Sequence, residues 1–101
     1  MKVVYKEPGE EAMIMHIDNT LKSLQTLVGG CIEHLELAPG IGIVVNEEGK
    51  LYDMAPNFFV PGIKDRIIGP AVFVGEDGGL SDEDVRTVMA FLRWHGVKQE
   101  D

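Results

Sequence analysis

The chain is 101 residues long, with 45% hydrophobic and 26% charged residues, which predicts a single globular domain over residues 1–101. Its 17 acidic and 9 basic residues give a net charge of −8. That charge argues against binding to a nucleic-acid backbone, because such binding needs a basic surface. No apolar run is long enough for a membrane span and the first residues lack a signal-peptide pattern, so we expect a cytoplasmic protein that does not bind membranes.

The first 30 residues predict two short strands followed by a helix. Residues 1–6 ("MKVVYK") are rich in strand-forming side chains and end at a turn, and residues 12–17 ("AMIMHI") suggest a second short strand. Leucines and a valine then recur at helical spacing over residues 21–28. Asp18 or Asn19 can cap the start of this helix, and the glycine pair that follows can end it.

Residues 31–54 predict a three-stranded meander. "CIEHLEL" alternates as a half-buried strand does, and "IGIVV" is apolar throughout, which is typical of a central strand covered on both faces. "NEEGK" is typical of a turn in which Gly49 takes a positive φ. After this turn, "LYDM" is expected to return as a short third strand.

The last third of the chain predicts a loop, a strand and a helix. Residues 55–66 ("APNFFVPGIKDR") contain two prolines and a glycine, so we expect irregular structure there. Residues 67–75 predict a strand interrupted at Gly69-Pro70, where proline cannot donate to a ladder. Ser81 is followed by three acids and then by an apolar stripe, which predicts a capped helix.

Together these elements predict an α+β fold, namely a small, mainly antiparallel sheet with two helices packed on one face. Trp94 lies near the end of the second predicted helix, beyond a stripe that already supplies a core face. It could complete the core or leave an apolar patch for self-association. We expect it at an interface, in a homo-oligomer.

Several motifs of the chain resemble the domain-of-unknown-function 3846 family, which occurs in phages, plasmids and bacterial genomes. The resemblance rests on "LQTLVGG", "VNEEG", the Pro56-Asn57 pair, the strand around Ile67-Ile68-Gly69 and the helix start "LSDED", and it covers roughly residues 13 to 92. The stretch "NFFVPGIKDR" is more aromatic than the family pattern. The resemblance implies an accessory or anti-defence protein in the cytoplasm of a bacterial host cell.

Two asparagines are candidate ligand-binding residues. Asn46 ends the apolar strand, and Asn57 follows a proline. Each amide offers donors and an acceptor, which suits it to reading the edge of a nucleobase or ribose. Their more ordinary role is to bond backbone groups in turns. The family pattern includes both positions, so both roles stay open.

Phe58, Lys64 and Arg66 form a second candidate group, because cations close to an exposed aromatic ring can hold phosphate and stack a base. In the alternative, the phenylalanine lies in the core and the two cations are solvated. No glycine-rich phosphate loop of known pattern accompanies them.

Metal and catalytic patterns are lacking in the sequence. The three histidines and the single cysteine show no zinc-site spacing, so we expect no metal and no cofactor. The paired acids at Glu47-Glu48 and after Ser81 are explained by a turn and a helix cap. We therefore expect a non-enzymatic protein.

Two functions remain as hypotheses. In the first, the protein sequesters a small nucleotide-like ligand at Asn46, Asn57, Phe58, Lys64 and Arg66. In the second, it is an acidic interaction module that blocks a host protein. A concave site containing both asparagines and one of the two cations favours the first, whereas acids gathered away from any pocket favour the second. The global charge of −8 opposes an anionic ligand.

Overall fold

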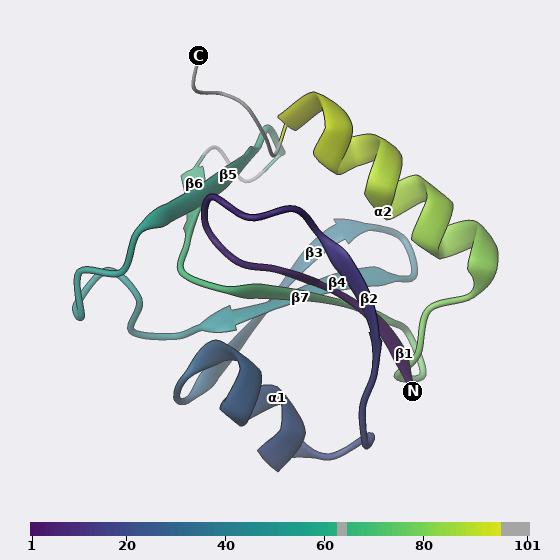
Figure 1. The fold of residues 1–101 in the computed structure, drawn as a ribbon, viewed down its shortest axis with the longest axis horizontal. Coiled ribbons are helices and arrows are strands. Elements are labelled where there is room, and N and C mark those ends of the chain that lie inside the picture. Colours follow the sequence, from purple (N-terminus) through teal and green to yellow (C-terminus); the bar gives the residue numbers. More distant parts are fainter. Residues whose placement is uncertain (63–64, 96–101) are drawn as a thin grey trace.

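A computed structural model describes residues 1–62 and 65–95 of the chain. This part contains seven strands and two helices in an α+β arrangement, as the sequence predicted (Figure 1). In chain order they are β1 (Lys2–Lys6), β2 (Met13–His16), α1 (Leu21–Val28), β3 (Ile32–Ala38), β4 (Ile41–Asn46), β5 (Pro56–Val60), β6 (Asp65–Ile68), β7 (Ala71–Gly75) and α2 (Asp82–His95). The expected strands near the N-terminus and the break at Gly69-Pro70 are confirmed.

The main sheet has five strands in the order β2-β1-β7-β4-β3, and each neighbouring pair is antiparallel. The late strand β7 lies at its centre, between β1 and β4. β5 and β6 form a separate antiparallel pair. The open edges of the main sheet therefore belong to β2 and β3 within the described residues.

The two helices lie on opposite faces of the main sheet, so the prediction that both pack on one face is wrong (Figure 1). α1 packs with Val3, Val44 and Val72, whereas α2 packs on the face that carries Ile43 and Phe73. Successive side chains of a strand point to opposite faces. Because the central strands are apolar at nearly every position, both of their faces need an apolar cover.

The β5–β6 pair shares the α2 face of the sheet. The Phe58 ring is buried there, with its centroid 5.6 Å from that of Phe73 in a stacked arrangement and 5.9 Å from that of Phe91 edge to face. The prediction of irregular structure is thus wrong for residues 56–60 and 65–66, which lie in β5 and β6, whereas residues 63 and 64 lie outside the described part of the chain. Pro56 begins β5 and Pro61 follows its end, where neither proline interrupts the strand.

The predicted third strand of the meander does not form. Residues 47–53 instead make successive turns, with the Tyr52 N–H donating to Glu48 O at 3.0 Å and Asp53 at a φ of 60°. The edge of β4 that this strand would have used is taken by β7. Leu51 and Tyr52 are consequently left at the surface.

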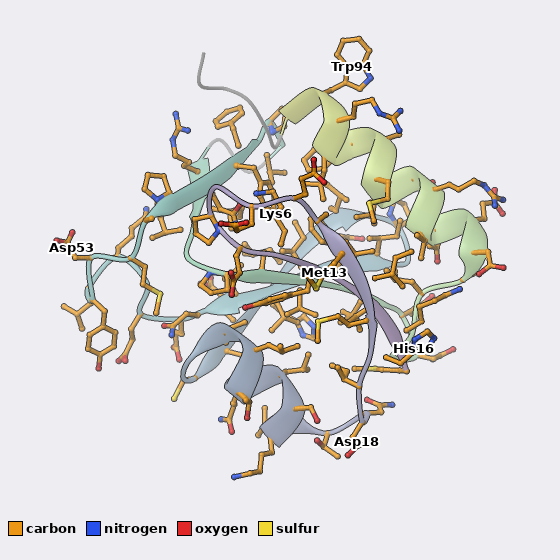
Figure 2. The ribbon with its side chains drawn as sticks, in the orientation of Figure 1. Lys6, Met13, His16, Asp18, Asp53 and Trp94 are labelled. Carbon is orange, nitrogen blue, oxygen red and sulfur yellow. The ribbon has the colours of Figure 1, made fainter. Side chains whose placement is uncertain are left out.

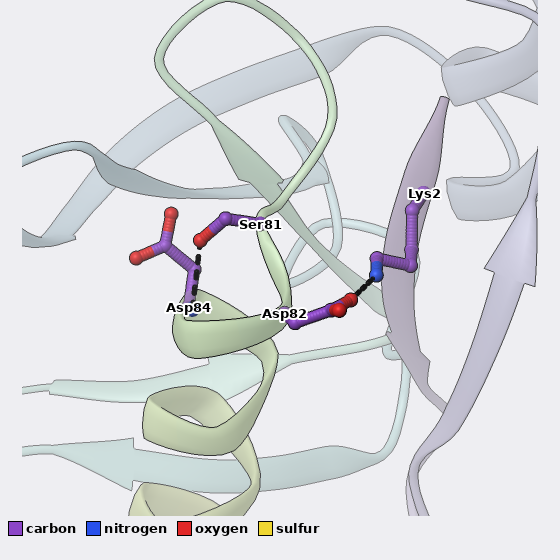
Figure 3. A network of polar contacts seen from close by, with 4 residues as sticks. All are labelled: Lys2, Ser81, Asp82 and Asp84. Atoms are coloured by element: carbon purple, nitrogen blue, oxygen red, sulfur yellow. Dashed lines mark hydrogen bonds and ion pairs between the residues drawn. The ribbon is translucent and has the colours of Figure 1, made fainter.

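Side-chain caps fix the ends of the helices. Thr20 Oγ1 accepts from the Ser23 N–H at 3.1 Å, so Thr20 is the cap residue of α1 rather than Asp18 or Asn19. Gly29, at a φ of 86°, ends α1 as predicted. Ser81 Oγ accepts from the Asp84 N–H at 3.0 Å at the start of α2, and Lys2 pairs with Asp82 close by (Figure 3).

Candidate functional site

Asn46 holds the end of α1 against the turn that follows β4. Its Nδ2 donates to Val28 O at 3.1 Å, and its Oδ1 accepts from the Glu48 N–H at 2.7 Å. The side chain is buried. A Cβ at Gly30 would lie 3.0 Å from Asn46 Nδ2, which shows how closely the backbone covers the amide. The amide therefore satisfies one of the open carbonyls at the helix end and closes an Asx turn.

Asn57 lies at the centre of a buried hydrogen-bond network that joins three segments of the chain. Its Nδ2 donates to Lys6 O and to Gly69 O, both at 2.8 Å, and its Oδ1 accepts from Lys6 Nζ at 3.0 Å. The donors and the acceptor of this amide all face protein atoms. Asn57 thus ties β5 to the end of β1 and to the link between β6 and β7.

Lys6 is a buried cation that sequence reasoning missed. Its side chain is 1% exposed, and its Nζ donates to Asn57 Oδ1 and, at 2.9 Å, to Glu7 O. Burial lowers the pKa of Lys6 from its ordinary value, against the raising effect of the Glu10 charge. Strand alternation could have found it, because Lys6 shares a face of β1 with the buried Val4.

The remaining predicted site residues separate in the structure. Phe58 is 1% exposed and lies among core rings, so its faces are not open for stacking a base. Lys64 lies outside the described residues. Arg66 is exposed on β6, where it pairs in register with Phe59.

Arg66 lines a cleft of about 360 Å³, here called the β6 cleft, between β6, the β3–β4 strands and the turn at residues 47–51. Leu35, Val45 and Ile67 supply apolar walls. The cleft also includes Asn46, but Asn57 is not among its lining residues. The structure therefore brings together two of the five predicted site residues, Asn46 and Arg66.

The charges of the β6 cleft are mixed. Its lining carries the carboxylates of Glu33, Glu47 and Glu48 and the cations Lys50 and Arg66. The charge of Glu48 also raises the pKa of Tyr52 in the same turn. An anionic ligand would meet more carboxylates than cations here, and the amide of Asn46 already has a donor and an acceptor partner.

A second concavity, here called the acidic groove, has a volume of about 450 Å³ and is lined by Tyr5, Glu7, Glu10, Glu11 and Met13. It borders the beginning of β2 and has three glutamates and no cation in its lining. Tyr5 donates to Glu7 Oε2 at 2.9 Å, and burial together with this carboxylate raises the pKa of Tyr5 to about 12. The groove fits a cationic group rather than a phosphate.

Two negative findings apply to residues 1–62 and 65–95. No group of three or more His, Cys, Asp or Glu side chains is arranged to hold a metal ion. No helix in this part of the chain combines the length and apolar character that a membrane span requires.

The comparison with protein families matches residues 1–93 to the family described as Domain of unknown function (DUF3846). This match extends beyond the region that carried the sequence resemblance. Nothing matched the chain in the comparisons with curated proteins and with solved structures.

Proposed function

The chain belongs to the DUF3846 family, and we propose that it is a non-enzymatic accessory protein that binds a basic partner protein through its acidic surface. The observation that supports this is that the predicted ligand contacts are buried, whereas acidic and large apolar side chains are exposed. Asn46, Asn57 and Phe58 are buried in structural contacts. Exposed carboxylates and exposed large apolar side chains remain at the surface, among them Met13, Ile14 and Trp94.

A protein partner suits this surface better than a small anion does. Interfaces combine apolar contacts with complementary charges, and opposite charge speeds the encounter. The net charge of −8 attracts a basic partner over distance and repels anions. The phage and plasmid setting implied by the resemblance supports an anti-defence role in which the partner is a protein of the bacterial host.

The test is affinity capture from bacterial lysate with a matched pair of variants. Glu7→Gln, Glu10→Gln and Glu11→Gln together neutralise the acidic groove. Glu36→Gln, Glu76→Gln and Asp77→Asn together remove three exposed acids from β3 and the β7–α2 connection and serve as the control. We expect one basic protein to be captured by the wild type and the control, lost with the triple variant, and released as salt rises.

The outcome that contradicts the proposal is equally direct. Capture of nothing specific, or capture that the triple variant leaves unchanged, would show that the acidic groove is not a protein-binding surface. Release of the partner at high salt does not by itself show where the partner binds, because salt screens all exposed charges. The comparison of the two variants does decide it.

A second candidate function rests on one observation, the joint presence of Asn46, Lys50 and Arg66 in the β6 cleft. In this alternative the cleft captures a nucleotide-like ligand. Thermal-shift measurements with cyclic and ADP-ribose-type nucleotides test it, because a ligand of the folded state raises the melting temperature by mass action. Arg66→Ala should abolish such a shift, and Arg93→Ala, on the exposed side of α2, should not. If no nucleotide shifts melting, this alternative is discarded.

A further inference from the structure

The outer edge of β2 presents open backbone groups. The N–H of Ile17 donates to Met1 O at 2.9 Å and the N-terminal ammonium donates back to Ile17 O, so these two residues form a hydrogen-bonded pair. Hydrogen-bonded pairs alternate along an antiparallel ladder. With Val3 opposite Met15 and Tyr5 opposite Met13, the backbone groups of Ile14 and His16 point away from β1. Across the described part of the chain, no strand pairs with them.

The side chains of β2 leave this edge unprotected. Met13 is 53% and Ile14 49% exposed, and no residue from Met13 to Ile17 carries a carboxylate, a lysine or an arginine. Proteins commonly protect an open edge with charges. The opposite edge strand, β3, follows that rule with exposed Glu33 and Glu36. The two edges of the sheet therefore differ in character.

Charges flank β2 on both sides of its apolar stretch. The acidic groove, with Glu7, Glu10 and Glu11, borders its start, and exposed Asp18 follows its end (Figure 2). Lys6 is buried and donates to Asn57, and among these acids the charge that raises its pKa is that of Glu10, so it offsets the acidic charge only in part. An occupant of this edge would meet an apolar centre between acidic ends.

A second copy of the chain fits this pattern poorly. Two β2 strands could pair antiparallel only through the backbone groups that point outward in each copy. With Ile14 opposite Ile14, Glu10 of each copy would lie opposite Asp18 of the other. Like charges directly opposite one another destabilise a strand pair. A segment with basic residues at its ends would instead place opposite charges at both positions.

We propose that β2 is a docking edge for an extended segment of the partner protein, which has an apolar centre and lysine or arginine at its ends and adds to the sheet as a sixth strand. This inference rests on the proposed function and specifies the surface and the binding mode. The backbone groups of Ile14 and His16 pair with the added strand, in the way that other sheets accept peptides at an open edge. Glu10, Glu11 and Asp18 select its basic ends.

A synthetic peptide tests the binding mode even while the partner itself is unidentified. The probe is a fluorescein-labelled nine-residue peptide with alternating valine and threonine at its centre and two lysines at each end. One matched peptide carries glutamates in place of the lysines, and another carries N-methyl groups on its pairing amides. Fluorescence anisotropy should show binding of the lysine peptide and at least about tenfold weaker binding of the other two, since each loses a charge pairing or its donors.

Two proline variants separate the edges of the sheet. In Ile14→Pro the lost N–H is one that points outward, so the pairing with β1 is kept while the docking edge loses a donor. His34→Pro is the matched control. The Glu47 N–H donates to Cys31 O, so the backbone groups of Cys31 face the chain that follows β4. By the same alternation, those of His34 point away from β4. We expect Ile14→Pro to weaken binding of the lysine peptide about tenfold and His34→Pro to leave it unchanged.

Two further measurements hold even if a proline variant fails to fold. Glu10→Lys with Glu11→Lys should reverse the preference from the lysine peptide to the glutamate peptide. In the wild type, hydrogen exchange at the Ile14 and His16 amides should be fast and should slow when the lysine peptide is bound. Unchanged exchange at these amides, or equal binding of the N-methylated peptide, would overturn strand addition.

The lysate capture distinguishes failure of this inference from failure of the proposed function. A partner that the acidic-groove triple variant loses but Ile14→Pro retains keeps the proposed function and overturns docking at β2. A partner that both variants lose, while His34→Pro captures it, supports both. The absence of any specific partner overturns both together.

Discussion

At the scale of single residues, the polar groups that look most like ligand contacts belong to the framework. Asn57 satisfies two carbonyls and one ammonium, and Asn46 satisfies a helix end and a turn. A buried amide with complete hydrogen bonding fixes a local structure, because any change leaves groups unsatisfied. The resemblance to the family at these two positions therefore has a structural explanation.

Asn57→Asp tests that explanation with an almost isosteric change. The new carboxylate can still accept from Lys6 Nζ, but it places an oxygen against Lys6 O and Gly69 O, which lose their donor. We expect the free energy of unfolding to fall by at least about 2 kcal/mol, measured by urea denaturation. Asn19→Asp, at an exposed position, should change it by less than about 0.5 kcal/mol. Equal stability of Asn57→Asp and the wild type would rule out the network.

The raised pKa of Tyr5 predicts that its contribution to the stability of the protein is lost at alkaline pH. Its pKa rises from 10.0 to about 12 on folding, so the folded state favours the protonated hydroxyl. The resulting stabilisation is complete below pH 10 and is lost as the pH rises through 12. Lys6, whose pKa is lowered, contributes in the opposite direction, because raising the pH toward its ordinary value of 10.5 relieves the cost of its buried charge.

The difference in unfolding free energy between the wild type and Tyr5→Phe isolates the tyrosine, since Lys6 is present in both. We expect the free energy of unfolding of the wild type minus that of the variant to be constant below pH 10 and to decrease between pH 10 and 12. A difference that stays constant across that interval would contradict the hydrogen bond from the partly buried Tyr5 hydroxyl to Glu7.

At the scale of elements, the link from β6 to β7 depends on a glycine that no other residue replaces without strain. Gly69 has a φ of +84°, and a Cβ there would lie 2.7 Å from Met54 Sδ. Gly9 has a similar φ of +77°, but a Cβ at that position would have no atom within 4 Å. Gly69→Ala should therefore cost about 2–4 kcal/mol and Gly9→Ala only about 1–2 kcal/mol in thermal or urea unfolding. Equal costs would show that Met54 does not pack on this link.

Local patterns predicted the elements that depend on local chemistry. The helix at 21–28 with its glycine end, the Ser81 cap and the break at Gly69-Pro70 are confirmed because capping and proline effects act within a few residues. The placement of β7 between β1 and β4 depends on pairing across the whole chain, and it displaced the expected third strand of the meander. Irregular structure was predicted in place of β5 because Pro56 and Pro61, which lie at the two ends of this strand, are residues that usually interrupt strands.

The candidate site was predicted less well than the fold. Residue type singled out Asn46 and Arg66, which line one cleft, but it could not show that the Asn46 amide donates to Val28 O and accepts from the Glu48 N–H. Nor could it show that Phe58 rather than Phe59 points into the core, because both faces of an unrecognised strand look alike in sequence. Burial and hydrogen-bond partners are properties of tertiary contact, which periodicity does not encode.

At the scale of the whole molecule, self-association remains a proposal that rests on Trp94. Its side chain is 81% exposed and projects from the end of α2 away from the body of the protein (Figure 2). Light scattering should give a mass above the 11.1 kDa of one chain for the wild type and for Arg93→Ala, and a mass near 11.1 kDa for Trp94→Ala. A monomeric wild type would exclude the homo-oligomer.

The central claim is that this acidic molecule binds protein at the β2 edge rather than a nucleotide in the β6 cleft. Amide chemical-shift mapping of the isotope-labelled protein tests both surfaces in one titration series, first with the lysine-flanked peptide and then with ADP-ribose. We predict shifts at Glu10, Glu11, Ile14 and His16 with the peptide and none with the nucleotide. Shifts confined to Gly49, Lys50 and Arg66 on addition of the nucleotide, with no response to the peptide, would contradict the account.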